Sequence, residues 1–123
     1  MLLENKFYRV LSKERESELS ARFHLAILPE CDVYDGHFPN EPVCPGVCNI
    51  ETIKECCMLL CGESVRYSAI KQCRLTALAT PQVCPEVDVT INLTPCCNGY
   101  MVQATVFDDK KTYMLLKGQL DKS

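Results

Sequence analysis

The sequence predicts an α+β fold in which an antiparallel sheet surrounds one buried helix. Residues 47–62 contain apolar side chains at helical spacing and no proline. Most of the chain after residue 67 instead alternates apolar and polar side chains, as half-buried strands do. One early helix followed by several strands is typical of α+β proteins. The length of 123 residues suits one domain, so we assign residues 1–123 to a single domain.

The elements follow in order along the chain. Residues 1–20 are mixed and charged, and they suit either a short helix or an opening strand. Residues 21–28 alternate as a strand does, and a proline ends them. Prolines at 39, 42 and 45 exclude a helix from the next segment, which we expect to be a structured loop.

The predicted helix is more apolar than a surface helix, so we expect it to be buried on most sides. Gly62 is its expected C-terminal cap. Turn residues at 97–99 and 108–110 separate the last three strands. The later strand candidates are residues 68–78, 86–95, 100–109 and 111–121.

The composition excludes several classes of protein. Hydrophobic residues make up 47% of the chain and charged residues 24%, as in ordinary globular proteins. A net charge of −3 argues against nonspecific nucleic-acid binding, which needs a basic surface. No apolar run approaches the roughly 20 residues of a membrane span, and the early charges are unlike a secretory signal. We therefore expect a cytoplasmic protein that binds no nucleic acid and has no membrane span.

Ten cysteines are many for this length. We interpret them as buried reduced thiols, because free cysteine packs as a small hydrophobic residue. A zinc site and disulfides are the alternatives, since two cysteine pairs have three intervening residues. These pairs are Cys44/Cys48 and Cys57/Cys61.

His37 and Glu51 stand out by their setting. The histidine lies in the proline-rich loop, and its ordinary pKa near neutrality suits a general base. The glutamate lies in the apolar helix, where a carboxylate must be paired, hydrogen-bonded or protonated, and a protonated carboxyl suits a general acid. The first free N–H groups of the helix, at Gly46 and Val47, favour developing negative charge nearby. The alternative is a hydrogen-bonded loop histidine and a solvated glutamate.

Residues 37–51, "HFPNEPVCPGVCNIE", resemble the signature segment of the β-hydroxyacyl-acyl-carrier-protein dehydratases, which have the hot-dog fold. Residues 69–86 resemble the strand that follows in that family. The glutamate at position 51 resembles the acidic residue found in one branch of these dehydratases, the branch that dehydrates its substrate without isomerising the product. The matching positions are His37, Phe38, Pro39, Pro42, Pro45, Gly46, Val47 and Glu51.

The resemblance implies a hot-dog fold and the elimination of water from a (3R)-hydroxyacyl thioester, in fatty-acid or related polyene biosynthesis. His37 would take the C2 proton, Glu51 would protonate the departing C3 hydroxyl, and the amide of Gly46 or Val47 would polarise the thioester carbonyl. The substrate-binding loop would include Phe38, Pro39 and Pro45. No metal or other cofactor is implied.

The resemblance also implies partners. The substrate would arrive on acyl carrier protein, and Arg66, Lys71 and Arg74 are either a basic landing patch for it or solvated strand residues. The active site would lie between two subunits, in a homodimer, a higher oligomer or a heterodimer with a related chain.

One departure from the family pattern is Glu55, which stands where glutamine is common. We expect it to face solvent, as glutamates usually do. Other functions remain open: a hot-dog thioesterase, an enoyl-CoA hydratase, or a non-catalytic hot-dog subunit. A zinc module built on His37, Cys44 and Cys48 is the remaining alternative.

Overall fold

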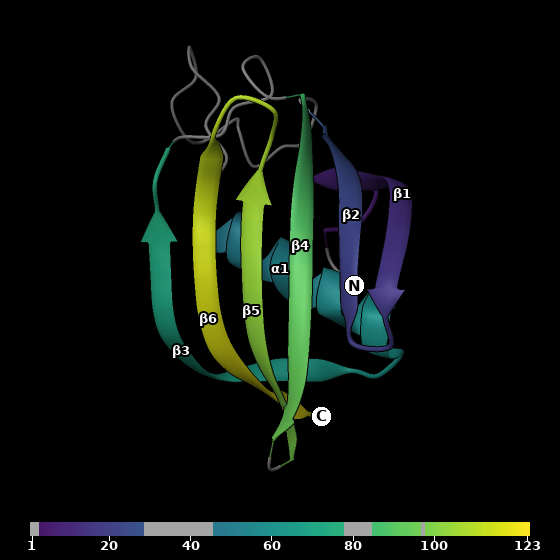
Figure 1. Cartoon of the computed structure of the whole chain (residues 1–123), viewed down its shortest axis with the longest axis vertical. Helices are drawn as coiled ribbons and strands as arrows, with labels where there is room; N and C mark the ends of the chain where they lie inside the picture. Colours follow the sequence, from purple (N-terminus) through teal and green to yellow (C-terminus); the bar gives the residue numbers. More distant parts are fainter. Residues whose placement is uncertain (1–2, 29–45, 78–84, 97) are drawn as a thin grey trace.

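The computed structural model describes residues 3–28, 46–77, 85–96 and 98–123. Six antiparallel strands form one sheet in the order β1-β2-β4-β5-β6-β3, and helix α1 lies across one of its faces (Figure 1). The predicted α+β arrangement is confirmed. The elements are β1 (Tyr8–Ser17), β2 (Ser20–Ile27), α1 (Gly46–Cys61), β3 (Val65–Leu75), β4 (Glu86–Cys96), β5 (Gly99–Phe107) and β6 (Thr112–Lys122).

The inner face of the sheet is built from alternate side chains of its strands. In β2 the buried residues include Phe23 and Leu25, and Phe23 pairs with Val89 of β4. Val89 belongs to a run of four alternating residues in β4, all at most 6% exposed. The alternation predicts one buried face for the strand at residues 21–28 and one for the strand at residues 86–95, and both predictions are confirmed. The run consists of Val87, Val89, Ile91 and Leu93.

Helix α1 is covered along its length, because none of its residues from Cys48 to Cys61 is exposed. Ile53 and Cys57 are fully buried against the sheet. The helix ends at Gly62, whose φ of 73° lies in the left-handed region that glycine tolerates best. The Gly62 N–H donates to the carbonyl of Met58 at 2.9 Å. The predicted burial and C-terminal cap are therefore confirmed.

The two edge strands are largely exposed. The N-terminal segment, which suited helix or strand, forms β1, and its residues 11–17 are all exposed. At the other edge, residues 68–75 of β3 are exposed on both faces of the sheet. Strand β3 begins earlier than predicted and has register shifts on either side of Ala69. Gly118 of β6 lies beneath that irregularity, where an added Cβ would lie 2.8 Å from the Ala69 carbonyl oxygen.

The six described cysteines form no disulfide with one another. The three buried ones lie in α1, and burial raises the pKa of Cys57, so this thiol stays protonated. The interpretation as buried reduced thiols fits these three, whereas Cys73 of β3 is exposed, because an edge strand has no layer covering it. Cys61 and Cys96 are partly buried. The remaining four cysteines lie outside the described residues.

Candidate functional site

The structure describes part of the predicted site. Gly46 and Val47 are the first two residues of α1, and Glu51 follows in the same helix. The free N–H groups at the start of α1 and one carboxylate therefore belong to a single rigid element. The predicted loop residues His37, Phe38, Pro39 and Pro45 lie outside the described residues.

Glu51 has the partner that a carboxylate in an apolar helix requires. Its Oε2 lies 2.9 Å from the Nζ of Lys54, one turn along the helix. The Glu51 side chain is 26% exposed and that of Lys54 is 24% exposed. A carboxylate that is exposed to so little solvent needs a nearby positive charge, and the ammonium of Lys54 supplies it. The sequence reasoning did not single out Lys54, although its i,i+3 spacing from Glu51 is visible in the sequence.

Tyr67 of β3 contacts the same part of the helix. Its hydroxyl donates a hydrogen bond of 2.8 Å to the carbonyl oxygen of Ile50, the residue before Glu51. Burial, with added repulsion from Cys57 and Glu51, raises the pKa of Tyr67, so the phenol stays protonated and keeps donating. Strand β3 therefore fixes the turn of α1 that carries Glu51. Nothing in the local sequence pattern links residue 67 to residue 50.

The expectation that Glu55 faces solvent is wrong. Its side chain is buried, with only 1% of the residue exposed. Its Oε2 accepts the N–H of Leu3 at 3.0 Å, and its Oε1 accepts the N–H of Glu4 at 3.0 Å and the hydroxyl of Tyr8 at 2.8 Å. The N-terminal segment thus covers the carboxylate and satisfies it, which makes burial of a charge acceptable. Glu55 therefore ties residues 3–8 to the central helix.

Asn49 is a second polar residue of α1 that the sequence reasoning missed. It is 5% exposed and lines a small gap between the helix, Phe7 and the inner face of the sheet. Its Nδ2 has no hydrogen-bond acceptor among the residues that the structure describes. A buried amide donor of this kind is unusual in folded proteins. Thr52 also lines the gap, and most of its other walls are apolar, with Leu25, Val89 and Val106 among them.

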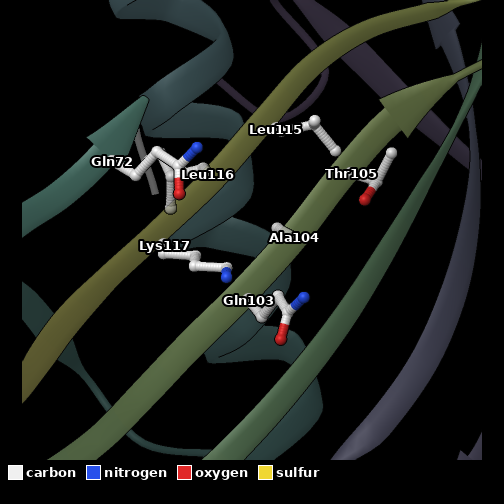
Figure 2. A pocket seen from close by; sticks show the side chains of 7 residues that line it. All are labelled: Gln72, Gln103, Ala104, Thr105, Leu115, Leu116 and Lys117. Carbon is white, nitrogen blue, oxygen red and sulfur yellow. The ribbon is translucent and has the colours of Figure 1, made fainter. Parts of the chain in front are cut away.

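The outer face of the sheet has a separate hollow of about 210 Å³ over β3, β5 and β6. Figure 2 views it from the side away from α1, whose coils lie behind the strands. Its polar side chains are Gln72, Gln103, Thr105 and Lys117. The sheet therefore separates this hollow from Glu51, and we do not assign the predicted chemistry to it.

A charged network lies on β2 and β4. Asp88 accepts a hydrogen bond of 2.8 Å from Arg22 and lies 2.7 Å from Nδ1 of His24, whose Nε2 contacts Glu86 at 2.5 Å. These contacts with Asp88 and Glu86 raise the pKa of His24. Burial alone would raise the pKa of Asp88, but the hydrogen bonds from Arg22 and His24 together lower it. Because Arg22 stacks on Phe107, with its guanidinium carbon 5.1 Å from the ring centroid, the network also reaches β5.

Neither a metal site nor a membrane span is found in the part of the chain that the structure describes. No group of three or more histidine, cysteine, aspartate or glutamate side chains there could hold a metal ion. No helix among the described residues is long and apolar enough to cross a membrane. The predicted zinc alternative on His37, Cys44 and Cys48 lies mostly outside these residues.

Solved structures match the fold along nearly the whole chain. One is the dehydratase heterocomplex ApeI:P from Xenorhabdus doucetiae, with a TM-score of 0.75, 20% identity, and coverage of 93% of this chain and 97% of that chain. Another is an uncharacterized protein from Erwinia carotovora subsp. atroseptica, with a TM-score of 0.73, 13% identity, and coverage of 94% and 96%. These matches confirm the expected hot-dog fold.

The sequence itself identifies the family. No curated protein matches the chain. The model of the ApeI-like family, described as ApeI dehydratase, matches residues 12–112 and so spans most of the protein. The resemblance to hot-dog dehydratases is therefore confirmed at the level of the family, although the glutamate-bearing branch is not distinguished. This chain belongs to the ApeI-like dehydratase family.

Proposed function

We propose that the protein removes water from a (3R)-hydroxyacyl thioester carried on acyl carrier protein and releases the trans-2-enoyl thioester. The observation that carries this proposal is Glu51, a partly exposed carboxylate in the first half of a buried helix that begins at Gly46. Membership of a dehydratase family supports the same reaction class. The product would enter fatty-acid or related polyene biosynthesis, and the whole of residues 1–123 would act as one domain in the cytoplasm.

In the proposed mechanism, His37 takes the proton from C2 while Glu51 gives a proton to the C3 hydroxyl. The C3–O bond breaks, water leaves, and the electrons of the C2–H bond form the C2=C3 double bond. Negative charge develops on the thioester carbonyl as the C2–H bond breaks. The N–H of Gly46 or Val47, at the positive end of α1, would stabilise that charge. Phe38, Pro39 and Pro45 would belong to the loop that holds the substrate.

The proposed site lies between two subunits, so that His37 of one chain meets Glu51 of another. The partner would be a second copy or a related hot-dog chain. The ApeI:P structure, described as a heterocomplex, makes the second arrangement worth testing. Acyl carrier proteins are acidic, and Arg66, Lys71 and Arg74 of β3 are all exposed, which suits a landing surface.

The test is hydration of a crotonyl thioester, the reverse reaction, by the wild type and two variants. His37→Ala and Glu51→Gln should each lower turnover by about 100-fold or more, as the loss of a general base or acid does. Glu16→Gln, at an exposed position of β1, is the matched control and should keep wild-type turnover. Circular dichroism checks that both variants remain folded.

Three outcomes would overturn the proposal. Full activity in both variants would exclude His37 and Glu51 from the chemistry. Release of free thiol from the acyl thioester without formation of the enoyl product would identify a thioesterase instead. A wild-type protein inactive on thioesters both alone and with a related hot-dog chain would indicate a non-catalytic subunit.

A further inference from the structure

The charged side chains of α1 have different partners. Glu55 accepts hydrogen bonds from the N-terminal segment, whereas Lys54 lies against Glu51. Lys54 is the only lysine or arginine in the sequence of this helix. Lys54, the single cation of α1, therefore lies against Glu51, the carboxylate that the proposed mechanism uses.

This ion pair is more enclosed than a typical surface pair. An exposed pair at i,i+3 contributes little, because water and salt screen both charges. Here about three quarters of each side chain is covered. With so much water excluded, the attraction between Lys54 and Glu51 is stronger and holds both side chains in place.

The two oxygens of Glu51 are not equivalent. Oε2 is buried and lies 2.9 Å from the ammonium of Lys54. It makes no well-aligned hydrogen bond with any described residue, so the ammonium holds it by charge attraction rather than by a directed bond. The exposed quarter of the side chain consequently belongs to Oε1 and the carbon atoms. Oε2 is therefore closed to a substrate, which leaves Oε1 as the oxygen of this carboxylate for the chemistry.

The backbone beneath this carboxylate is also fixed. The hydroxyl of Tyr67 donates a hydrogen bond to the carbonyl oxygen of Ile50, the residue before Glu51. The backbone is thus held from β3, and the head of the Glu51 side chain is held by Lys54. Restraint at both ends leaves the carboxylate little freedom to turn.

We propose that Lys54 is a positioning residue, which holds Oε2 of the ionised Glu51 and directs Oε1 toward the water that adds to C3 in the hydration direction, where the carboxylate accepts a proton from that water. This inference rests on the catalytic role proposed for Glu51. Proton transfer needs the donor within hydrogen-bond reach of the acceptor, and a displacement of about 1 Å can slow a reaction by about 100-fold. Lys54 would therefore affect turnover more than substrate binding.

The test compares Lys54→Met, which keeps the length but loses the charge, with Lys54→Arg, which keeps the charge. A small crotonyl thioester is the substrate, so that carrier-protein binding does not enter. Lys54→Met should lower kcat by about 10–100-fold and change KM by less than about threefold. Lys54→Arg should recover kcat to within about fivefold of the wild type. Lys13→Met, at an exposed position of β1, is the matched control and should leave both constants unchanged.

A double variant separates positioning from a general loss of structure. In the Glu51→Gln background, Lys54→Met should cause no further loss, because the residue it positions is already gone. Lys54→Gln serves as the second uncharged variant if Lys54→Met does not fold.

The outcomes distinguish the two proposals. If Glu51→Gln is inactive while Lys54→Met keeps wild-type kcat, only the positioning role is overturned. An equal loss in Lys54→Arg and Lys54→Met would also overturn it. If Glu51→Gln itself keeps full activity, the proposed function fails first.

Discussion

Replacing the buried Glu55 with alanine removes the carboxylate that joins the N-terminal segment to α1. That carboxylate accepts two backbone N–H groups, from Leu3 and Glu4, and the hydroxyl of Tyr8. Burial, with the nearby Cys56 and the hydrogen bond to Glu55, raises the pKa of Tyr8, so its phenol remains a donor at ordinary pH. All three donors lose their acceptor in Glu55→Ala.

The magnitude follows from two routes by which the variant can relax. If residues 3–8 stay in place, each orphaned donor costs about 1–3 kcal/mol. If the segment detaches, Phe7 and Tyr8, each 1% exposed, lose burial that contributes about 1.5–3 kcal/mol per side chain. The first route costs about 3–9 kcal/mol for three donors and the second about 3–6 kcal/mol for two side chains. The variant relaxes by the less costly route, so we expect the free energy of unfolding to fall by about 3–6 kcal/mol.

Two milder variants each remove only part of the hydrogen bonding to Glu55. Tyr8→Phe removes one donor and keeps the two backbone contacts. In Glu55→Gln the amide group replaces one oxygen and then faces either Leu3 N–H or Glu4 N–H, since each oxygen accepts one of them. Each variant should cost about 1–3 kcal/mol. In the Glu55→Ala background, Tyr8→Phe should have a smaller effect than it has alone, because its acceptor is already absent.

The assay is urea denaturation followed by circular dichroism, at one protein concentration so that any association of subunits is held constant. Amide hydrogen exchange at Leu3 and Glu4 gives a local readout, because both N–H groups should lose protection in Glu55→Ala. Glu16→Ala, at an exposed position of β1, is the control and should change stability by less than about 0.5 kcal/mol. If Glu55→Ala matched this control, Glu55 would behave as a solvent-facing glutamate and the reasoning would be refuted.

Two further predictions concern the sheet. Contacts with Asp88 and Glu86 raise the pKa of His24 above its ordinary 6.5, so their contribution to stability is complete below pH 6.5 and is lost as the pH rises through the raised pKa. Urea denaturation should therefore show that His24→Gln destabilises the protein most below pH 6.5, and an equal loss at all pH values would contradict this. Gly118→Ala should cost about 1–3 kcal/mol, because its Cβ would lie 2.8 Å from the backbone oxygen of Ala69; a neutral effect in the same assay would mean that β3 shifts freely.

Regular periodicity made the centre of the fold predictable from the sequence. Apolar and polar residues alternate along β4 from Val87 to Leu93, and α1 has apolar residues at helical spacing throughout, so the sequence predicts both elements without knowledge of their neighbours. Strand β1 was harder to predict because it is an edge strand. Its residues 11–17 are exposed on both faces, so no alternation marks them, and β1 is defined by its backbone pairing with β2.

The partners of individual side chains could not be predicted in the same way. Glu55 bonds to residues more than 50 positions away, and Tyr67 bonds to Ile50 from another element. Such contacts depend on how elements pack, which no local pattern encodes. The site residues in α1 were found because a motif marks them, whereas the contacts that hold them in place carry no motif.

The two carboxylates of α1 lie one helical turn apart, and like charges at that spacing repel when both face the same space. The structure avoids this by giving each its own compensation: Glu55 has the donors of the N-terminal segment, and Glu51 has Lys54. Because Glu55 is 1% exposed and both its oxygens are occupied, it is unavailable to a substrate. Glu51, at 26% exposure, is the carboxylate of this helix that a substrate can reach. Substitution at Glu55 should therefore change stability, and substitution at Glu51 should change turnover, with little overlap between the two effects.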